Sequence, residues 1–462
     1  MYLPDLVVRS RRILTPGGGR AGAIHIRNGR IIGIVDIDAV PPGCPVDDVG
    51  EDAVLPGVVD SSVQVHAPGA IVSESFERTT RAAAAGGVTT IIATPFGCAL
   101  PTTSVPALES TCHAAEGHCF VDAGFWGGVV PGNAGELAAL FQAGILGFQC
   151  ALMSSGDDGS VGVSEAELRA SMPALTRTRT LLRARAELAA PVEPPGAERR
   201  SHRKWFERIP GLSRPERRYA TYLDSRPKAA ENEAIALLIQ LCDAYRLPTH
   251  CVHLSSADTL TPVFRARSRR LPFSVDTCPH YLFFVAEEIP DGAVEYKCAP
   301  PIRGRDNREL LWAALAGGLI HSVASDHRPA APSSTGSSNF LEARSGIASL
   351  PIELSIMWTA ASARGYTLDQ VVRWMCQMPA QLAGLARKGK IDVGYDADLV
   401  VFDPDSELTV QPDARRGQRT PYDGRRLRGV VKRTYLRGVR VHDGEDTSAD
   451  PAGRLLLQRR PP

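Results

Sequence analysis

The chain has 462 residues, which exceeds one ordinary domain and is enough to bury large hydrophobic cores. With 44% hydrophobic residues, 22% charged residues and a net charge of +1, it is ordinary for a globular protein and has no global field to attract nucleic acid or an anionic membrane. No apolar stretch approaches the roughly 18 residues of a membrane-spanning helix, and the N-terminus has no secretory apolar region. Ten cysteines are scattered singly, which favours free thiols and predicts a cytoplasmic protein.

Both ends of the chain predict short β-strands. Near the N-terminus, alternating apolar residues flank the pair Asn28-Gly29, which is typical of a two-residue hairpin. Residues 398–402 and 429–439 show the same kind of pattern near the C-terminus. We therefore expect one small β-sandwich domain built from both termini, with residues 1–55 as its first part and residues 388–462 as its second.

The middle of the chain, residues 56–387, predicts repeated strand–helix units. Residues 78–85 have a helical composition, Gly86-Gly87 ends that helix, and residues 88–92 form a β-branched strand. Strand-like segments then recur at residues 125–130, 146–149, 250–253, 273–275 and 322–325. This repetition predicts an α/β fold, namely a (β/α)8 TIM barrel.

One segment interrupts this rhythm. Residues 190–218 are rich in proline and in basic residues, and they predict a long loop between a strand and a helix. A solvated surface loop is the favoured interpretation, and a role in binding phosphate or a partner is the alternative.

Several motifs of the chain resemble those of the cyclic amidohydrolases (allantoinase, hydantoinase and dihydroorotase), most densely those of the allantoinases. They lie at residues 54–66, 81–90, 125–131, 225–227, 253–256, 277–282, 297–303, 325–327 and 394–400. Each motif alone is weak, but their order and spacing identify the chain as a member of this family. The resemblance implies the amidohydrolase type of TIM barrel, a role in purine or ureide metabolism, and a homo-oligomer, either a dimer or a tetramer.

The family resemblance also implies a binuclear metal centre at the C-terminal mouth of the barrel. Its ligands are two histidines from the first strand, a carboxylated lysine, two further histidines and an aspartate. The matching positions of this chain are Ser62, Gln64, Gln149, Arg185, His253 and Asp326. Only His253 and Asp326 retain the ligand type, and Gln149 has no amine to carry a carbamate.

These replacements predict that no metal cofactor is bound, and zinc is expected only if this assignment of ligand positions is wrong. The cation Arg185 would repel a metal ion, and it is predicted to pair with Asp326 beside Gln64 and Gln149. A less favoured alternative is a single metal ion on His253 and Asp326. Its third ligand would be His66, His280 or Glu187.

Three functions are compatible with this pattern. The favoured one is a binding or regulatory homologue that is inactive as a metal-dependent allantoinase and that could work beside an intact paralogue. The second is a metal-free enzyme that opens, closes or isomerises a ureide, a hydantoin or a related cyclic amide. In that enzyme Asp326 and His327 would be catalytic, and Arg185, Arg328, Gln64 and Gln149 would bind the substrate.

The third and least favoured function is a true allantoinase that hydrolyses allantoin to allantoate. In all three cases the expected partner is a small ureide or cyclic amide, together with further copies of the chain. Neither nucleic acid nor a membrane is expected.

Overall fold

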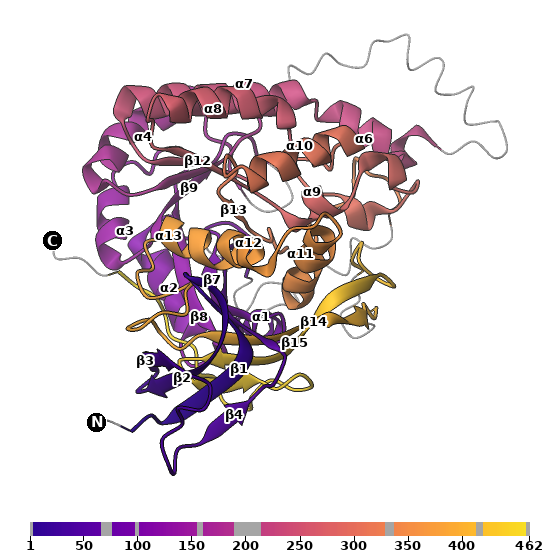
Figure 1. Ribbon diagram of the computed structural model, residues 1–462. Coiled ribbons are helices and arrows are strands. Elements are labelled where there is room, and N and C mark those ends of the chain that lie inside the picture. Colours follow the sequence, from indigo (N-terminus) through magenta and orange to yellow (C-terminus); the bar gives the residue numbers. More distant parts are fainter. Residues whose placement is uncertain are drawn as a thin grey trace, which may run out of the picture.

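Two eight-stranded sheets organise the protein, which is described by a computed structural model (Figure 1). The structure describes residues 3–65, 76–97, 101–154, 160–188, 214–328, 337–412 and 419–458. The first sheet is parallel and occupies the middle of the chain, and the second is built from both ends. No helix among the described residues combines the length and the apolar character needed to cross a bilayer.

The parallel sheet contains its strands in sequence order. They are β6 (Val58–Val63), β7 (Val88–Ala93), β8 (Asp122–Gly128), β9 (Gly147–Ala151), β10 (Leu182–Arg185), β11 (Thr249–Val252), β12 (Phe273–Thr277) and β13 (Ser322–Val323). A parallel bridge joins Val63 of β6 to His327, just beyond β13, and the Gln64 amide donates to the His327 carbonyl at 2.9 Å. The sheet therefore curls until its two edges meet, which is consistent with a (β/α)8 barrel.

Helices surround this curled sheet (Figure 1). They are α1 (Phe76–Ala85), α2 (Val105–Ala115), α3 (Leu137–Ala143), α4 (Glu165–Thr178), α6 (Tyr219–Ser225), α7 (Lys228–Tyr245), α8 (Leu260–Ser268), α9 (Pro279–Phe283), α10 (Arg305–Ala316), α11 (Glu353–Ser362), α12 (Leu368–Val372) and α13 (Met378–Leu382). A π-helical turn, η7 (Arg373–Gln377), joins the last two. Helix α1 ends where Gly86-Gly87 predicted, because Gly87 adopts a φ of +79°. The strands are buried on both faces, as expected when helices cover a parallel sheet.

The second sheet joins the two ends of the chain, seen as indigo and yellow strands in Figure 1. Its strands are β1 (Leu6–Thr15), β2 (Gly18–Arg27), β3 (Arg30–Val35), β4 (Val46–Asp48), β5 (Ala53–Pro56), β14 (Leu399–Thr409), β15 (Arg426–Leu436) and β16 (Val439–His442). Strand β5 pairs antiparallel with β14, which places both ends of the chain in one sheet. Asn28 and Gly29 have φ values of 48° and 75° between β2 and β3, so the predicted hairpin is confirmed.

The chain passes from one sheet to the other at Gly57, between β5 and β6. A side chain at this position would overlap Thr89, so the close approach requires glycine. The domain boundaries after residues 55 and 387 stay predictions. The predicted basic loop, residues 190–218, lies outside the described residues except for 214–218, where a 3-10 turn, η1, spans Pro215–Arg217.

Candidate active site

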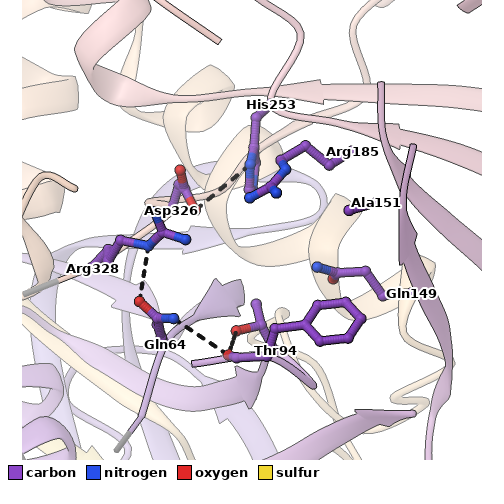
Figure 2. A pocket seen from close by; sticks show the side chains of 9 residues that line it. Gln64, Thr94, Gln149, Ala151, Arg185, His253, Asp326 and Arg328 are labelled. Carbon is purple, nitrogen blue, oxygen red and sulfur yellow. Dashed lines mark hydrogen bonds and ion pairs between the residues drawn. The ribbon is translucent and has the colours of Figure 1, made fainter. Parts of the chain in front are cut away.

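A polar pocket lies at the C-terminal ends of the parallel strands, where barrel enzymes place their catalytic residues. The pocket is small, with a cavity volume of about 30 Å³, and it is partly open to solvent. Figure 2 shows the lining side chains, which are Gln64, Thr94, Phe96, Gln149, Ala151, Arg185, His253, Asp326 and Arg328. They come from the ends of β6, β7, β9, β10, β11 and β13. The pocket thus collects most of the residues that the sequence singled out from six separate strands.

His253 and Asp326 form the central pair of the pocket. The His253 Nδ1 lies 3.6 Å from Asp326 Oδ1, and its Nε2 shares a 2.8 Å hydrogen bond with the Ser62 hydroxyl. The Asp326 side chain is 27% exposed, so its carboxylate can reach a ligand in the pocket. His253 and Asp326 have φ values of 61° and 47°, which are unfavourable for residues other than glycine. Such strained backbone is typical of functional sites, where the surrounding structure holds it in place.

Arg328 lines the pocket next to Asp326 (Figure 2), and Gln64 orients it. The Arg328 Nε donates to Gln64 Oε1 at 2.9 Å, and Nη1 donates to the Ser345 carbonyl at 3.2 Å. The Gln64 Nε2 donates to the Phe96 carbonyl at 3.4 Å. Gly97 leaves the room that Gln64 occupies, since a side chain at residue 97 would overlap the glutamine. The amide of Gln64 therefore fixes the guanidinium of Arg328 at the pocket wall.

Arg185 lies at the end of β10 and lines the pocket near His253 (Figure 2). Its Nη2 donates to the Ser160 hydroxyl at 2.7 Å and lies 3.5 Å from the Met153 carbonyl. The predicted ion pair with Asp326 is not among the ion pairs of the described residues, where Asp326 pairs with His253. The two side chains nevertheless face the same open volume.

A further arginine, Arg183, was missed by sequence reasoning. It is fully buried behind Gln149, and its Nη1 donates to Gln149 Oε1 at 2.8 Å. Its guanidinium lies 4.6 Å from the ring centre of Trp126, and its Nη2 lies 3.9 Å from Asp276. Burial lowers the pKa of Arg183 to about 10, against the opposing effect of Asp276, so it remains protonated at neutral pH. The available signal was the spacing of two arginines two residues apart on a strand, which places both on one face.

His327 is not one of the residues that line the pocket. Its ring is buried, and its Nδ1 accepts hydrogen bonds from the backbone amides of Ser349 at 3.2 Å and Leu350 at 3.3 Å. Its carbonyl accepts from Gln64 where the edges of the parallel sheet meet. These contacts are those of a structural residue, and the catalytic role suggested for His327 stays a prediction.

Of the three residues considered as a third metal ligand, one pairs with an arginine, one is buried and does not line the pocket, and one lies outside the described part of the chain. Glu187 pairs with Arg226 at 2.7 Å. His280 is buried, and this burial lowers its pKa to about 3. His66 lies outside the described residues.

The six positions that correspond to the family's metal ligands present a poor donor set. A hydroxyl, two carboxamides and a guanidinium stand there beside one imidazole and one carboxylate. Within the described residues, no three His, Cys, Asp or Glu side chains are grouped so that they could hold a metal ion. Arg185 and Arg328 also place positive charge on the same pocket. The side chains that the structure describes therefore do not fit a pair of metal ions.

Comparison with known proteins identifies the family. The Amidohydrolase family pattern matches residues 202–441. An allantoinase from Streptomyces avermitilis is 41% identical over 460 residues, covering 98% of each chain. The chain belongs to the amidohydrolase family. An allantoinase from Saccharomyces cerevisiae is 37% identical, covering 90% of this chain and 88% of its own length.

Solved structures agree with this assignment. The L-hydantoinase (dihydropyrimidinase) from Arthrobacter aurescens superimposes on this amidohydrolase with a TM-score of 0.85 at 26% identity. The match covers 98% of this chain and 100% of the hydantoinase chain. Both sheets are therefore included in the similarity.

These relatives correct two of the expectations drawn from the sequence. The interpretation as an inactive binding or regulatory homologue is wrong, because the similar proteins at 31–41% identity over nearly the full chain are allantoinases. The expectation of no cofactor is also contradicted, because amidohydrolases related to this chain generally depend on metal ions. The interpretation as an inactive homologue relied on a few replaced ligands. The similarity of the rest of the chain outweighs them. The donor set of this pocket and the metal dependence of the family thus disagree.

Proposed function

We propose that this amidohydrolase is an allantoinase, which hydrolyses a ring amide of allantoin and releases allantoate. The observation that carries the proposal is the 41% identity to an allantoinase over 98% of both chains. The several polar groups that line the pocket are suited to a polar heterocycle. Its place at the ends of six parallel strands further supports an active site.

The proposed reaction adds one water molecule to the ring. The water oxygen bonds to a ring carbonyl carbon, the bond from that carbon to the ring nitrogen breaks, and the nitrogen takes up a proton. One cyclic amide thereby becomes one carboxylate and one ureido group. The residues of the pocket must therefore move a proton and stabilise negative charge on oxygen.

Asp326 is placed to move the proton. Its carboxylate faces the pocket and would accept a proton from the attacking water, then return it to the departing nitrogen. His253 positions this carboxylate from 3.6 Å and is itself held by the Ser62 hydroxyl. Arg185 and Arg328 would stabilise the negative charge that develops on the carbonyl oxygen.

The two glutamines would recognise the ureide. A ureide presents alternating N–H donors and carbonyl acceptors, which match the two ends of a carboxamide. Gln149 is held through its Oε1 by Arg183, so its Nε2 is available as a donor to a ligand carbonyl. This arrangement would place the ring between Gln149 and the Arg328–Gln64 pair.

The test is formation of allantoate from allantoin by the purified full-length protein. The assay is run with no added metal and with zinc, cobalt or manganese added, so that any ion the reaction uses is supplied. We expect allantoate to form faster than without protein in at least one condition. Failure to form allantoate in every condition, by a protein shown to be folded, would overturn the proposal.

We also propose how the two sheets are closed, in which compartment the protein lies and that it self-associates. The curled sheet is proposed to be a closed barrel of the amidohydrolase type, with the sheet from both termini forming a small β-sandwich. The cysteines within the described residues are free, which supports a reducing compartment such as the cytoplasm. Self-association is proposed from the family resemblance, and light scattering on the purified chain tests it.

A further inference from the structure

Asp60 is a buried acid in strand β6 that does not line the pocket. Its Oδ1 accepts hydrogen bonds from the backbone amides of Ser62 at 3.1 Å and Ser325 at 3.2 Å. Its Oδ2 accepts a hydrogen bond from the Ser325 hydroxyl. One buried side chain thereby joins the first strand of the parallel sheet to the segment that follows the last strand, β13.

These hydrogen bonds lead to both members of the central pair of the pocket. The Ser62 hydroxyl shares a 2.8 Å hydrogen bond with His253 Nε2, and Ser325 directly precedes Asp326 in the chain. The His253 Nδ1 in turn lies 3.6 Å from Asp326 Oδ1. Asp60 therefore holds one neighbour of each member, and through these neighbours it sets the geometry of the pair.

The backbone at Asp326 requires support of this kind. Its φ of 47° is unfavourable for a residue with a side chain and persists only where the surroundings hold it. The Ser325 hydroxyl donates to Asp60 and also accepts from the His327 amide at 2.8 Å. It thus links Asp60 to the residues on both sides of Asp326. Loss of this link would let the turn relax and displace the Asp326 carboxylate.

A second buried acid, Glu353 at the start of α11, lies near Asp60. Burial raises the pKa of Glu353 well above its usual range, and the negative charge of Asp60 raises it further. Glu353 therefore stays protonated at neutral pH. The acceptor of the three hydrogen bonds remains the carboxylate of Asp60.

We propose that Asp60 is a positioning residue, which holds Asp326 where its carboxylate can move a proton between water and the ring nitrogen. The measurement by activity rests on the proposed function, in which Asp326 is the proton carrier. Asp60 does not touch the substrate in this arrangement. Its loss should lower kcat and leave KM nearly unchanged, because displacement of a catalytic group by about 1 Å costs about 100-fold in rate.

Two substitutions of Asp60 separate positioning from folding. Asp60→Ala removes all three hydrogen bonds and should lower kcat for allantoin about 100-fold, with KM within about 2-fold of native. Asp60→Asn keeps an oxygen for the two amides and should restore kcat to about a tenth of native. Both rates are expressed per folded molecule, as measured by circular dichroism. Native kcat in Asp60→Ala, or a change confined to KM, would overturn the proposal.

A double-substitution cycle tests whether Asp60 acts through Ser325. Ser325→Ala removes the hydroxyl link from its other end and should lower kcat about 10-fold, as Asp60→Asn does. The variant with both changes should also lose only about 10-fold, because the second change breaks a link that is already lost. A fall of about 100-fold, the product of two independent effects, would overturn the proposal. This cycle stays decisive if Asp60→Ala does not fold.

Asp398→Asn is the matched control. Asp398 is also a buried acid, and its Oδ1 accepts the backbone amide of Arg437 at 2.8 Å, but it pairs with Lys388 and does not line the pocket. This variant should be less stable than the native protein and keep the native kcat per folded molecule. A loss of kcat as great as that in Asp60→Asn would overturn the proposal, because the effect would not be specific to Asp60.

Hydrogen exchange distinguishes failure of the positioning from failure of the proposed function. In Asp60→Ala the amides of Ser62 and Ser325 lose their acceptor, so peptides that contain them should exchange at least about 10-fold faster than in the native protein or in Asp398→Asn. Faster exchange, in a protein whose native form hydrolyses no allantoin, would overturn the proposed function and leave the positioning standing. Unchanged exchange with unchanged hydrolysis would do the reverse.

Discussion

Charged side chains gather in two regions of the protein, and the two regions differ in how far those charges are buried. At the junction of the two sheets, the buried ammonium of Lys388 lies 2.6 Å from Asp122, 2.6 Å from Asp398 and 3.2 Å from Asp396. Arg437 lies 2.6 Å from the same Asp122. Each of these carboxylates has a cationic partner, and the side chains of Lys388, Asp122 and Asp398 are at most 5% exposed.

The pocket shows the opposite arrangement. Arg185 and Arg328 face an open volume with Asp326 as the opposing carboxylate. A buried network of ion pairs holds the two sheets together and cannot reach a ligand. Charged side chains at a pocket that is partly open to solvent can contact one. We infer that the junction is structural and that the pocket is functional, and four predictions test or sharpen this contrast.

The largest effect on activity is expected at Asp326. Asp326→Asn removes the proposed proton carrier and should lower the rate of allantoin hydrolysis by about 100-fold or more, as expected for loss of a general base. The measurement is kcat for allantoate formation at saturating allantoin. Asp258→Asn, on the surface beside Lys228, serves as the control and should retain the native rate. Native activity in Asp326→Asn would exclude it as the proton carrier.

The largest effect on stability is expected at the junction. Lys388→Met should lower the free energy of unfolding by about 3–5 kcal/mol, because Asp122 and Asp398 would be buried with one cation fewer. Urea unfolding measures this change. The control is Lys228→Met, which breaks an exposed pair with Asp258 and should cost about 1 kcal/mol or less. Equal costs for the two variants would mean that the junction contributes no more than a surface ion pair.

An acid-dependent loss of stability is expected from His280, which is buried without a hydrogen-bond partner in the described structure. Burial lowers the pKa of His280 from 6.5 to about 3, so between these values the unfolded chain binds a proton that the folded protein does not. The free energy of unfolding should therefore fall as the pH falls below 6.5. The loss reaches about 2 kcal/mol at about pH 5, at roughly 1.4 kcal/mol per pH unit.

The variant His280→Phe isolates this contribution. It cannot bind a proton, so its unfolding free energy should change less between pH 7 and about pH 5 than that of the native protein. Urea unfolding at both values measures the difference. An unchanged pH dependence would show that His280 is not the group responsible.

The smallest effect is expected at Gln64, which orients Arg328 without carrying charge. Gln64→Ala removes the acceptor for the Arg328 Nε and should raise KM for allantoin by about 2- to 10-fold, as expected for one hydrogen bond. Steady-state kinetics of allantoate formation measures the change. Gln381→Ala, at an exposed position on α13, should leave KM unchanged. An unchanged KM in Gln64→Ala would show that Arg328 does not need this anchor.

Sequence reasoning predicted the fold better than it predicted the function. The hairpin at Asn28-Gly29, the strand after Gly87 and the pairing of the two chain ends depend on local turn chemistry and on apolar periodicity, which are readable along the chain. The functional interpretation was wrong because it depended on the chemistry of four replaced ligands. Similarity to allantoinases extends over the whole chain and carries more information than those positions.

The pocket likewise combines features that could be predicted from the sequence with features that only the structure shows. The sequence by itself, through its resemblance to the cyclic amidohydrolases, determined that Gln64, Gln149, Arg185, His253 and Asp326 would meet. All five line one pocket at or near the carboxyl ends of parallel strands, which converge in a barrel. Only the tertiary structure decided which of them bind one another. It joined Asp326 to His253 rather than to Arg185, and it placed Arg183 behind Gln149. These pairings depend on distances of a few ångströms between side chains from different strands, which no pattern within one strand contains.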